Sequence, residues 1–175
     1  MKKIILTLAV LFVAVSASAQ TWGVGGRVGS GLQAVGEYKF ENGNYIEARF
    51  GLGLKSKYGY RTVISADFTA LYQWNVLNMD WTPNAGQWSL DAGVGVNVGG
   101  NPRVGDIAET QGPLFYCGVA GGVKLGFTFK NTPIKLAVDW TPSVGPVMYH
   151  NQLVSEIAFN AMALSDFGIS CVYYF

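Results

Sequence analysis

Three residues near the C-terminal end of the chain are of the types that could form a catalytic set. His150 is the only histidine of the sequence, and Ser155 and Glu156 follow it within one predicted loop, 145–162. A serine activated by a histidine and oriented by a carboxylate can attack an acyl carbonyl, as in an acyl hydrolase or acyltransferase. However, this spacing matches no motif that holds such a set in place, and a loop preorganises side chains poorly. We therefore assign no catalytic residue and keep this set as a weaker alternative.

The elements that must position these residues are strands. Turn signals divide the chain into segments in which apolar residues alternate with polar or small ones, which is the period of a β-strand. Between the segments lie tight turns at 30–31, 41–44 and 130–133, and longer connections at 55–61, 76–87, 100–113 and 145–162. The pattern predicts an all-β domain of about eight antiparallel strands over residues 20–175. The segments cover Thr21–Gly29, Leu32–Phe40, Tyr45–Leu54, Thr62–Asn75, Trp88–Gly99, Leu114–Phe129, Ile134–Tyr149 and Ala163–Phe175.

Each predicted strand has one apolar face and one face that carries its charges. The apolar face is rich in aromatic and branched residues, such as Trp22, Phe50 and Ile169, and none of the charges falls in the middle of it. Five basic residues meet five acidic ones on the opposite face, beside the amides Gln73 and Asn97. The charged set is Arg27, Glu37, Lys39, Glu47, Arg49, Asp67, Asp91, Lys124, Lys135 and Asp139.

The alternation alone does not say which face points into the barrel. A soluble barrel of the lipocalin type would place the apolar face inside. An eight-stranded barrel is only just wide enough to be filled by side chains, so these aromatics would crowd it. They also concentrate near strand ends (Trp22, Phe40, Trp74, Trp88, Phe115, Phe129 and Phe175), as in the aromatic girdles of membrane barrels. An even balance of charge is what a narrow interior needs. We therefore expect a closed, up-and-down transmembrane β-barrel with a salt-bridged interior.

The N-terminal residues have the pattern of a cleaved export signal. Lys2 and Lys3 precede a short apolar run, 4–15, and the small residues Ala17-Ser18-Ala19 form a cleavage site. We expect residues 1–19 to be a signal peptide. Its removal takes two of the twelve basic residues and leaves ten against eleven acidic ones, so no polybasic face for nucleic acid is expected.

The composition agrees with a membrane barrel. Only 13% of the residues are charged although 50% are hydrophobic, whereas about a quarter are charged in a typical soluble domain. The run of apolar residues needed for a spanning helix does not occur after residue 20. Cys117 and Cys171 should lie on strands separated by another strand, nearly 10 Å apart, which is beyond the roughly 7 Å limit for a disulfide. We expect both to be unpaired and to face lipid.

Further candidate sites are weak. Asp67, Asp91 and Asp139 could suggest a carboxylate-based protease of the omptin type, but inward lysines and arginines are the more natural partners. Lys55, Lys57 and Arg61 make one outer loop basic, which suits the phosphates of lipopolysaccharide and equally an ordinary solvated loop. The glycine runs at 23–26 and 118–122 lack the Rossmann spacing, and no Cys/His cluster indicates a metal. We expect no metal and no cofactor.

The overall pattern resembles small outer-membrane barrels of the OmpX and OmpA-transmembrane type, and most of all short outer-membrane barrel proteins of Bacteroidetes. The resemblance covers nearly the whole mature chain. It rests on the segments Trp22–Arg27, Tyr72-Gln73-Trp74, Pro133–Pro142 and Tyr173-Tyr174-Phe175. It implies that Tyr173 and Phe175 belong to a C-terminal signal for the barrel-assembly machinery. It also implies roles in adhesion, envelope integrity or host contact, although a shared fold does not transfer function.

From these observations we expect a monomeric protein of the Gram-negative outer membrane that is not an enzyme. Its plugged barrel would contact membrane lipid and lipopolysaccharide and would present outer loops to an extracellular ligand. Two alternatives stay open, a lipid A-modifying enzyme that uses His150, Ser155 and Glu156, and a soluble periplasmic lipid-binding barrel.

Overall fold

The computed structural model describes residues 21–57, 61–100, 113–150, 155–161 and 164–175, with side chains described outside 53–65, 101–114 and 149–163. All regular structure in these segments is β-strand, and they contain no helix long and apolar enough to span a bilayer. The predicted signal peptide, 1–19, lies outside the described residues. The strands are β1 (Trp22–Val28), β2 (Gly31–Lys39), β3 (Tyr45–Lys57), β4 (Arg61–Met79), β5 (Gly86–Gly100), β6 (Pro113–Phe129), β7 (Ile134–Trp140), β8 (Ser143–His150), β9 (Ser155–Ala161) and β10 (Phe167–Tyr174).

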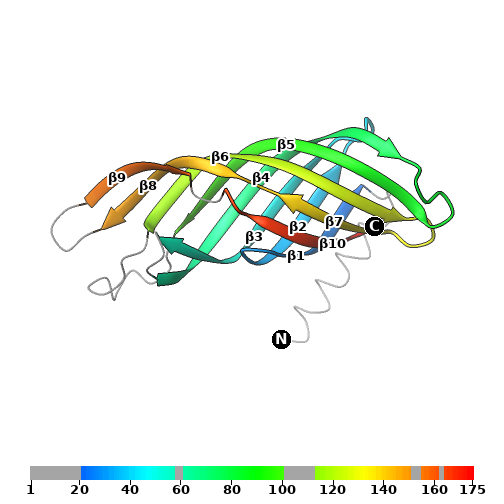
Figure 1. The fold of residues 1–175 in the computed structure, drawn as a ribbon. Coiled ribbons are helices and arrows are strands. Elements are labelled where there is room, and N and C mark those ends of the chain that lie inside the picture. Colours follow the sequence, from blue (N-terminus) through cyan, green and yellow to red (C-terminus); the bar gives the residue numbers. More distant parts are fainter. Residues whose placement is uncertain (1–20, 58–60, 101–112, 151–154, 162–163) are drawn as a thin grey trace, which may run out of the picture.

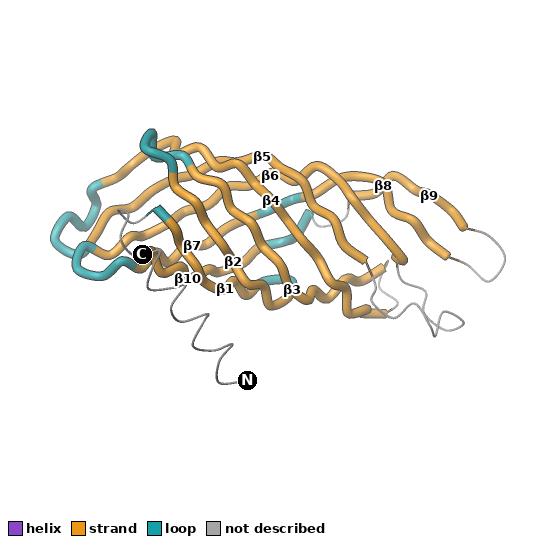
Figure 2. Tube along the Cα trace, turned by 180° about the vertical axis from the view of Figure 1, so that it is seen from behind, coloured by secondary structure: helices purple, strands orange, loops and turns teal. Residues whose placement is uncertain are grey.

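The strands form a closed antiparallel barrel (Figures 1 and 2). The hydrogen-bonded order is β5-β4-β3-β2-β1-β10-β7-β6, and a β5–β6 pairing closes the ring. The strands therefore make eight positions around the barrel, and β8 continues β7 along β6 while β9 is an extra strand beside β8. This confirms the predicted all-β, up-and-down barrel. We call the end that holds the β2–β3, β4–β5 and β6–β7 turns the turn end, and the opposite one the loop end.

The seventh predicted strand, Ile134–Tyr149, is interrupted at Thr141 and Pro142. The two halves keep one register on β6, since Val123 faces Trp140 and Ala120 faces Ser143. Pro142 accepts a 2.9 Å hydrogen bond from the Gly121 amide but has no N–H to return, so the break falls where one ladder bond is missing. Beyond the break β8 pairs with β9, whereas β7 pairs with β10.

Two predicted loops at the loop end are wrong. The segment 145–162 was expected to be a loop, but it holds most of β8 and all of β9, which pair from Val144↔Ala161 to His150↔Ser155. In the segment 55–61, residues 55–57 and Arg61 are strand as well, because β3 and β4 stay paired up to Lys57↔Arg61, while 58–60 lie outside the described residues. At the tip of β3 the residues Lys55-Ser56-Lys57 have no apolar alternation, whereas Ile157, Phe159 and Ala161 of β9 do alternate with Glu156, Ala158 and Asn160, so the sequence carried a signal for β9.

Half of a third predicted connection, 76–87, is also strand. β4 runs to Met79 and β5 starts at Gly86, with a register shift between Asn75 and Leu77. This β-bulge inserts Val76 and resets the alternation, so two apolar residues stand side by side and hide the strand from a period-2 reading. After the bulge Leu77 faces Leu90 and Asn78 faces Ser89.

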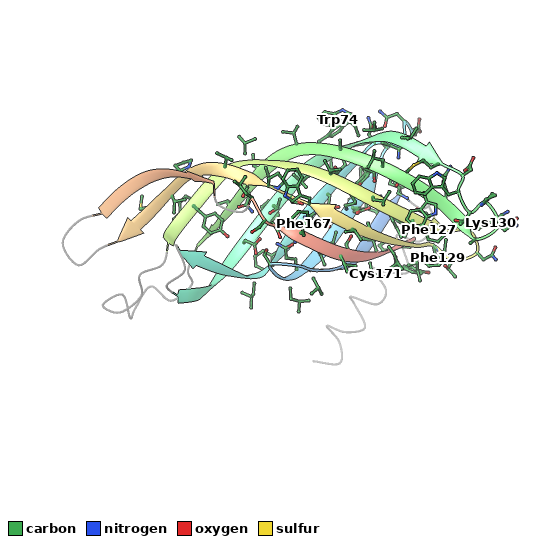
Figure 3. All side chains as sticks on the ribbon, in the orientation of Figure 1. Trp74, Phe127, Phe129, Lys130, Phe167 and Cys171 are labelled. Atoms are coloured by element: carbon green, nitrogen blue, oxygen red, sulfur yellow. The ribbon has the colours of Figure 1, made fainter. Side chains whose placement is uncertain are left out.

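The apolar residues face outward and the charges face the interior. On the outer wall the exposed fraction is 68% for Leu32 and 64% for Ile169, whereas it is 0% for Arg27 and Glu47 inside. Trp74 projects beyond the upper edge of the barrel in Figure 3, and Phe167 and Cys171 are exposed as well. Among the described residues the buried hydrophobic cluster is small and consists of Val35, Val172 and Tyr174. Packing inside this barrel is therefore mainly polar.

Two glycines are required by the local geometry. Gly43 adopts φ 85° in the β2–β3 turn, where its amide donates to the Phe40 carbonyl at 3.1 Å. Gly168 on β10 lies against the Arg27 side chain, and a Cβ there would come within 2.4 Å of the guanidinium carbon. Gly36 on β2 is the contrasting case, since a Cβ at that position would have no atom within 4 Å.

We expect Gly168→Ala to lower the free energy of unfolding by about 1–3 kcal/mol, because the added methyl group must displace the paired guanidinium of Arg27. The matched control is Gly36→Ala, which adds the same methyl group into open space and should change that free energy by less than about 0.5 kcal/mol. Urea titration of the folded protein, followed by tryptophan fluorescence, measures both values. Equal effects at the two positions would show that the close approach at Gly168 is not limiting.

Candidate functional site

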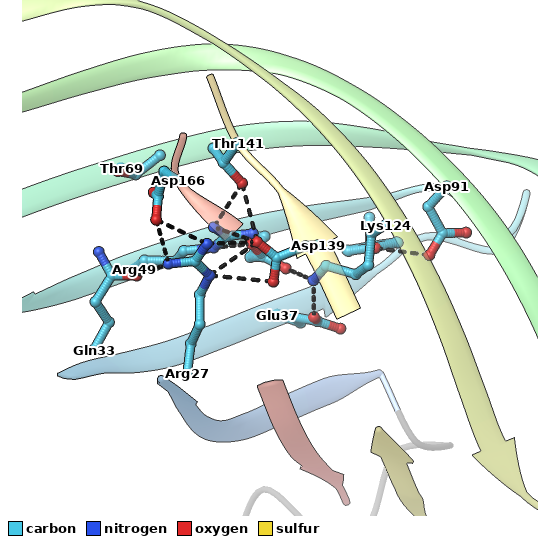
Figure 4. Close-up of polar contacts among 12 residues, drawn as sticks. Arg27, Gln33, Glu37, Arg49, Thr69, Asp91, Lys124, Asp139, Thr141 and Asp166 are labelled. Carbon is cyan, nitrogen blue, oxygen red and sulfur yellow. Dashed lines mark hydrogen bonds and ion pairs between the residues drawn. The ribbon is translucent and has the colours of Figure 1, made fainter. Parts of the chain in front are cut away.

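The interior side chains form the candidate site, and their loop-end part is organised by Arg27 (Figure 4). The Arg27 Nη2 lies 2.7 Å from Asp139 Oδ1, and its Nε donates to both oxygens of the same carboxylate. The Arg27 Nη1 donates to Gln33 at 3.1 Å and to Asp166 at 3.2 Å. Ser30 adds a 2.8 Å hydrogen bond to Asp166. All three guanidinium nitrogens of this buried arginine therefore have acceptors.

Asp139 is shared by a second arginine from the other side of the barrel. The Arg49 Nη1 lies 3.3 Å from Asp139 Oδ1 and donates to Thr141 Oγ1 at 2.9 Å. Thr141 in turn donates to Asp139 at 3.1 Å. The Arg49 Nε pairs with Glu47 on the same strand. One carboxylate thus accepts hydrogen bonds from two cations and a hydroxyl group.

Lys124 links this cluster to the middle of the barrel. Its ammonium group pairs with Glu37 at 3.1 Å and also with Glu47. The Tyr174 hydroxyl donates to the other oxygen of Glu37. The side chains of Lys124, Glu37 and Glu47 are at most 1% exposed, so each charge depends on these partners for its solvation.

A third group lies nearer to the turn end. Lys135 pairs with Asp91 at 2.8 Å, and the Tyr45 hydroxyl donates to the same carboxylate at 2.9 Å. Asn75 donates to the other oxygen of Asp91 at 2.9 Å. Lys39 is half-buried, and its ammonium group lies 3.4 Å from the centre of the Tyr174 ring in a cation–π contact.

Two of the ion pairs cross the full width of the barrel. In the ring order β2 stands opposite β6, and β3 stands opposite β7. The Lys124–Glu37 pair joins the first two strands and the Arg49–Asp139 pair joins the second two. An eight-stranded barrel has just enough room for such side chains. The interior is therefore bridged by side chains between two successive pairs of opposite strands.

The structure places nine of the ten predicted interior charges among the buried residues, and the tenth, Lys39, is half-buried. It adds a sixth carboxylate, Asp166, which the even balance predicted from sequence did not include. Tyr45 and Tyr174 were also missed as inward residues. Strand parity could have found both, because Tyr45 is in phase with Glu47, and Tyr174 is in phase with Ser170.

Several buried polar atoms have no hydrogen-bond partner among the described residues. They are the two amide atoms of Gln73, Arg49 Nη2, Asn97 Oδ1 and Ser143 Oγ. Gln73 is 0% exposed and fills the space beside Gly93 and Gly122, since a Cβ at Gly93 would come within 2.3 Å of its oxygen. These atoms give the interior a capacity to bind water or another small polar group.

The other predicted site residues lie away from the interior network described above. His150 ends β8 opposite Ser155, and Glu156 faces Tyr149 across the same hairpin, so these three belong to paired strands and not to one loop; their side chains lie outside the described residues. Lys55 and Lys57 on β3 and Arg61 on β4 are likewise placed only by their backbones. Tyr173 is exposed on β10 and Phe175 follows that strand.

Cys117 and Cys171 are both free, on β6 and β10 with β7 between them. The described part of the chain contains no group of three or more His, Cys, Asp or Glu residues that could hold a metal ion. In comparisons with known proteins, no protein-family model, curated sequence or solved structure matches the chain.

We expect Asp139→Asn to lower the free energy of unfolding by about 3–5 kcal/mol, because it leaves two buried guanidinium groups without the carboxylate they share. Glu41→Gln removes one negative charge from the exposed β2–β3 turn and should change that free energy by less than about 0.5 kcal/mol. Urea unfolding of both variants measures the difference. A small effect for Asp139→Asn would contradict a central role for this pair of arginines.

Proposed function

We propose that this chain is an exported, monomeric outer-membrane barrel of the OmpX type that acts as a plugged scaffold. In this proposal residues 1–19 direct export, Tyr173 and Phe175 serve in recognition by the assembly machinery, and the loop end faces outward. The scaffold would hold the segments at its loop end, including the basic positions Lys55, Lys57 and Arg61, against lipopolysaccharide or an extracellular ligand. Adhesion or envelope integrity is the corresponding role.

The observation that carries the proposal is the apolar outer wall. Large apolar side chains stay exposed on every strand whose side chains are described, for example Phe50 at 63% and Val119 at 62%. In water such a surface exceeds by far the isolated patches of soluble monomers. In a bilayer the same wall is satisfied by lipid, and the closed ring leaves the backbone groups of the barrel paired.

Aromatic rings near the turn end support the same proposal. Trp22, Tyr38, Phe40, Tyr72 and Trp74 form a continuous series of ring contacts, with centroids 4.7–6.0 Å apart. A second series joins Trp81, Trp88, Phe127 and Phe129 at 4.9–5.7 Å. Such rings are typical of the membrane–water interface, where an apolar body and a polar edge are both accommodated.

The bridged interior favours a scaffold over a pore. Ion pairs cross the barrel between opposite strands, so ions or solutes would have to break buried charge pairs to pass. The interior also argues against a carrier of apolar ligands, because such a barrel needs an apolar lining. A soluble lipid-binding barrel would require the reverse arrangement of the two faces. Enzymatic use of His150, Ser155 and Glu156 has no support beyond their positions on one hairpin.

Cys171 offers a direct test of membrane insertion. In a Cys117→Ala background reconstituted in lipid vesicles, a charged, water-soluble maleimide should fail to label Cys171, because lipid covers this outward side chain. An Asn42→Cys control, placed in the exposed β2–β3 turn with both native cysteines replaced by alanine, should react with the same reagent added on both sides of the vesicles. Rapid labelling of Cys171 in vesicles, together with solubility of the protein without detergent, would contradict the proposal.

The absence of an open pore is tested by electrical recording. Purified protein in a planar bilayer should give no steady conductance, because the Lys124–Glu37 and Arg49–Asp139 pairs bridge the interior. A general porin incorporated in the same lipid provides the positive control. Steady single-channel currents from the folded protein would contradict the plugged state while leaving membrane insertion intact.

A further inference from the structure

The β4–β5 hairpin at the turn end differs from the other two turns there. The β2–β3 turn contains Glu41, Asn42 and Asn44, and the β6–β7 turn contains Lys130, Asn131 and Thr132, so both are polar. The β4–β5 hairpin instead carries exposed apolar side chains, with exposed fractions of 59% for Val76, 51% for Leu77 and 65% for Trp81. We call residues 75–91 the aromatic flap.

The aromatic flap extends beyond the β3–β4 pairing on one of its two sides. Pairing of β3 with β4 ends at Tyr45↔Gln73, whereas pairing of β4 with β5 continues after the bulge to Met79↔Trp88. On its other side β5 stays paired with β6 down to Gly86↔Phe129. Together with the end of β6, the flap forms a three-stranded extension at the turn end, visible at the right of Figure 1 and beside the labels Phe127, Phe129 and Lys130 in Figure 3.

The two faces of the flap continue the two faces of the barrel. On its inner side Asn78 donates to Asn75 at 2.7 Å in a solvent-exposed hydrogen bond, and Ser89 donates to the buried Asp91 at 3.4 Å, which links the flap to the polar interior. On its outer side Leu77 stands opposite Leu90, and Met79 stands opposite Trp88. The bulge at Val76 makes this possible, because regular alternation from the inward Asn75 through Val76 would turn Leu77 inward and Asn78 outward.

The outer face of the flap is joined to the outer wall without a polar gap. Rings pass from Phe129 and Phe127 on β6 to Trp88 on β5 and then to Trp81 in the turn. The Trp88 indole donates to Thr82 Oγ1 at 3.0 Å, which ties the turn to this series. A medium that covers the outer wall of β5 and β6 therefore also contacts Trp88 and Trp81 of the flap.

We propose that the aromatic flap lies in the headgroup region of the bilayer and binds lipid of the leaflet at the turn end. The proposal rests on the proposed function, since it extends the lipid-covered wall to a segment that would otherwise be in water. The polar inner face then looks toward the mouth of the barrel, and Trp81 marks the outer limit of lipid contact. The flap gives the barrel a taller lipid-facing wall at β4–β6 than at β2–β3.

The test uses a fluorescent bimane label on single cysteines in a Cys117→Ala/Cys171→Ala background, in phosphatidylcholine vesicles. Leu77→Cys and Asn78→Cys form a matched pair, because they are neighbours on opposite faces of the flap. Trp81→Cys probes the tip, Asn42→Cys the polar turn, and Cys171 in the Cys117→Ala protein the middle of the wall. Each site is quenched separately with a lipid carrying a nitroxide near its headgroup, with a lipid carrying it deep in the chain, and with iodide on both sides.

We expect labels at positions 77 and 81 to lose more fluorescence with the shallow nitroxide lipid than with iodide, and labels at 78 and 42 to show the reverse. Cys171 should respond to the deep nitroxide lipid. Heat-modifiable gel mobility confirms that each variant is folded.

Quenching by iodide at both 77 and 81, with Cys171 still quenched by lipid, would overturn the flap proposal and indicate a surface for a soluble partner or a second copy of the chain. Iodide quenching at Cys171 as well would overturn membrane insertion itself.

Discussion

A charged side chain that leaves water needs a partner of opposite charge, and this constraint governs the interior of the barrel. Asp139 illustrates it most clearly, because its single carboxylate lies between Arg27 of β1 and Arg49 of β3. Lys124 plays the complementary part by pairing with Glu37 and Glu47. These ion pairs therefore fix the position of a strand along the barrel axis relative to strands that are not its hydrogen-bonded neighbours.

Hydrogen bonding of the backbone and pairing of the charges specify the same register. A slip of one residue in β2 would turn Glu37 to the outer wall and bring Gly36 or Tyr38 inside, so Lys124 would lose one of its two carboxylate partners. Apolar packing contributes less to register here, since the buried hydrophobic cluster of the described residues contains only Val35, Val172 and Tyr174. The ionic network thus supplies the specificity that an apolar core supplies in a soluble domain.

The strands and the charged face could be predicted from the sequence because they follow one period. Arg27, Glu37, Asp91 and Lys124 all lie in regular alternation with outward apolar residues, and the structure buries them. Prediction failed where the period is broken or weak. The bulge at Val76 shifts the phase of β4, and the polar tip of β3 stays paired without any apolar alternation. β9 is a different case, because Ile157 and Phe159 do alternate with polar or small residues in a short strand that the sequence analysis assigned to a loop. Which cation meets which carboxylate depends on distances across the ring, which no local pattern contains.

The pairing of β1 with β10 has a consequence for how the molecule can be made. Gly23 faces Tyr174 and Val28 faces Ile169, so the contacts that close the ring join segments almost a whole chain length apart. Contacts so distant in sequence slow folding, because the chain loses much conformational entropy before these contacts can stabilise it. Until β10 has been synthesised, β1 and β7 each lack a neighbouring strand. Their unpaired backbone N–H and C=O groups then favour aggregation. We therefore expect the unfolded chain to need a chaperone that prevents aggregation until β10 can pair with β1 and β7.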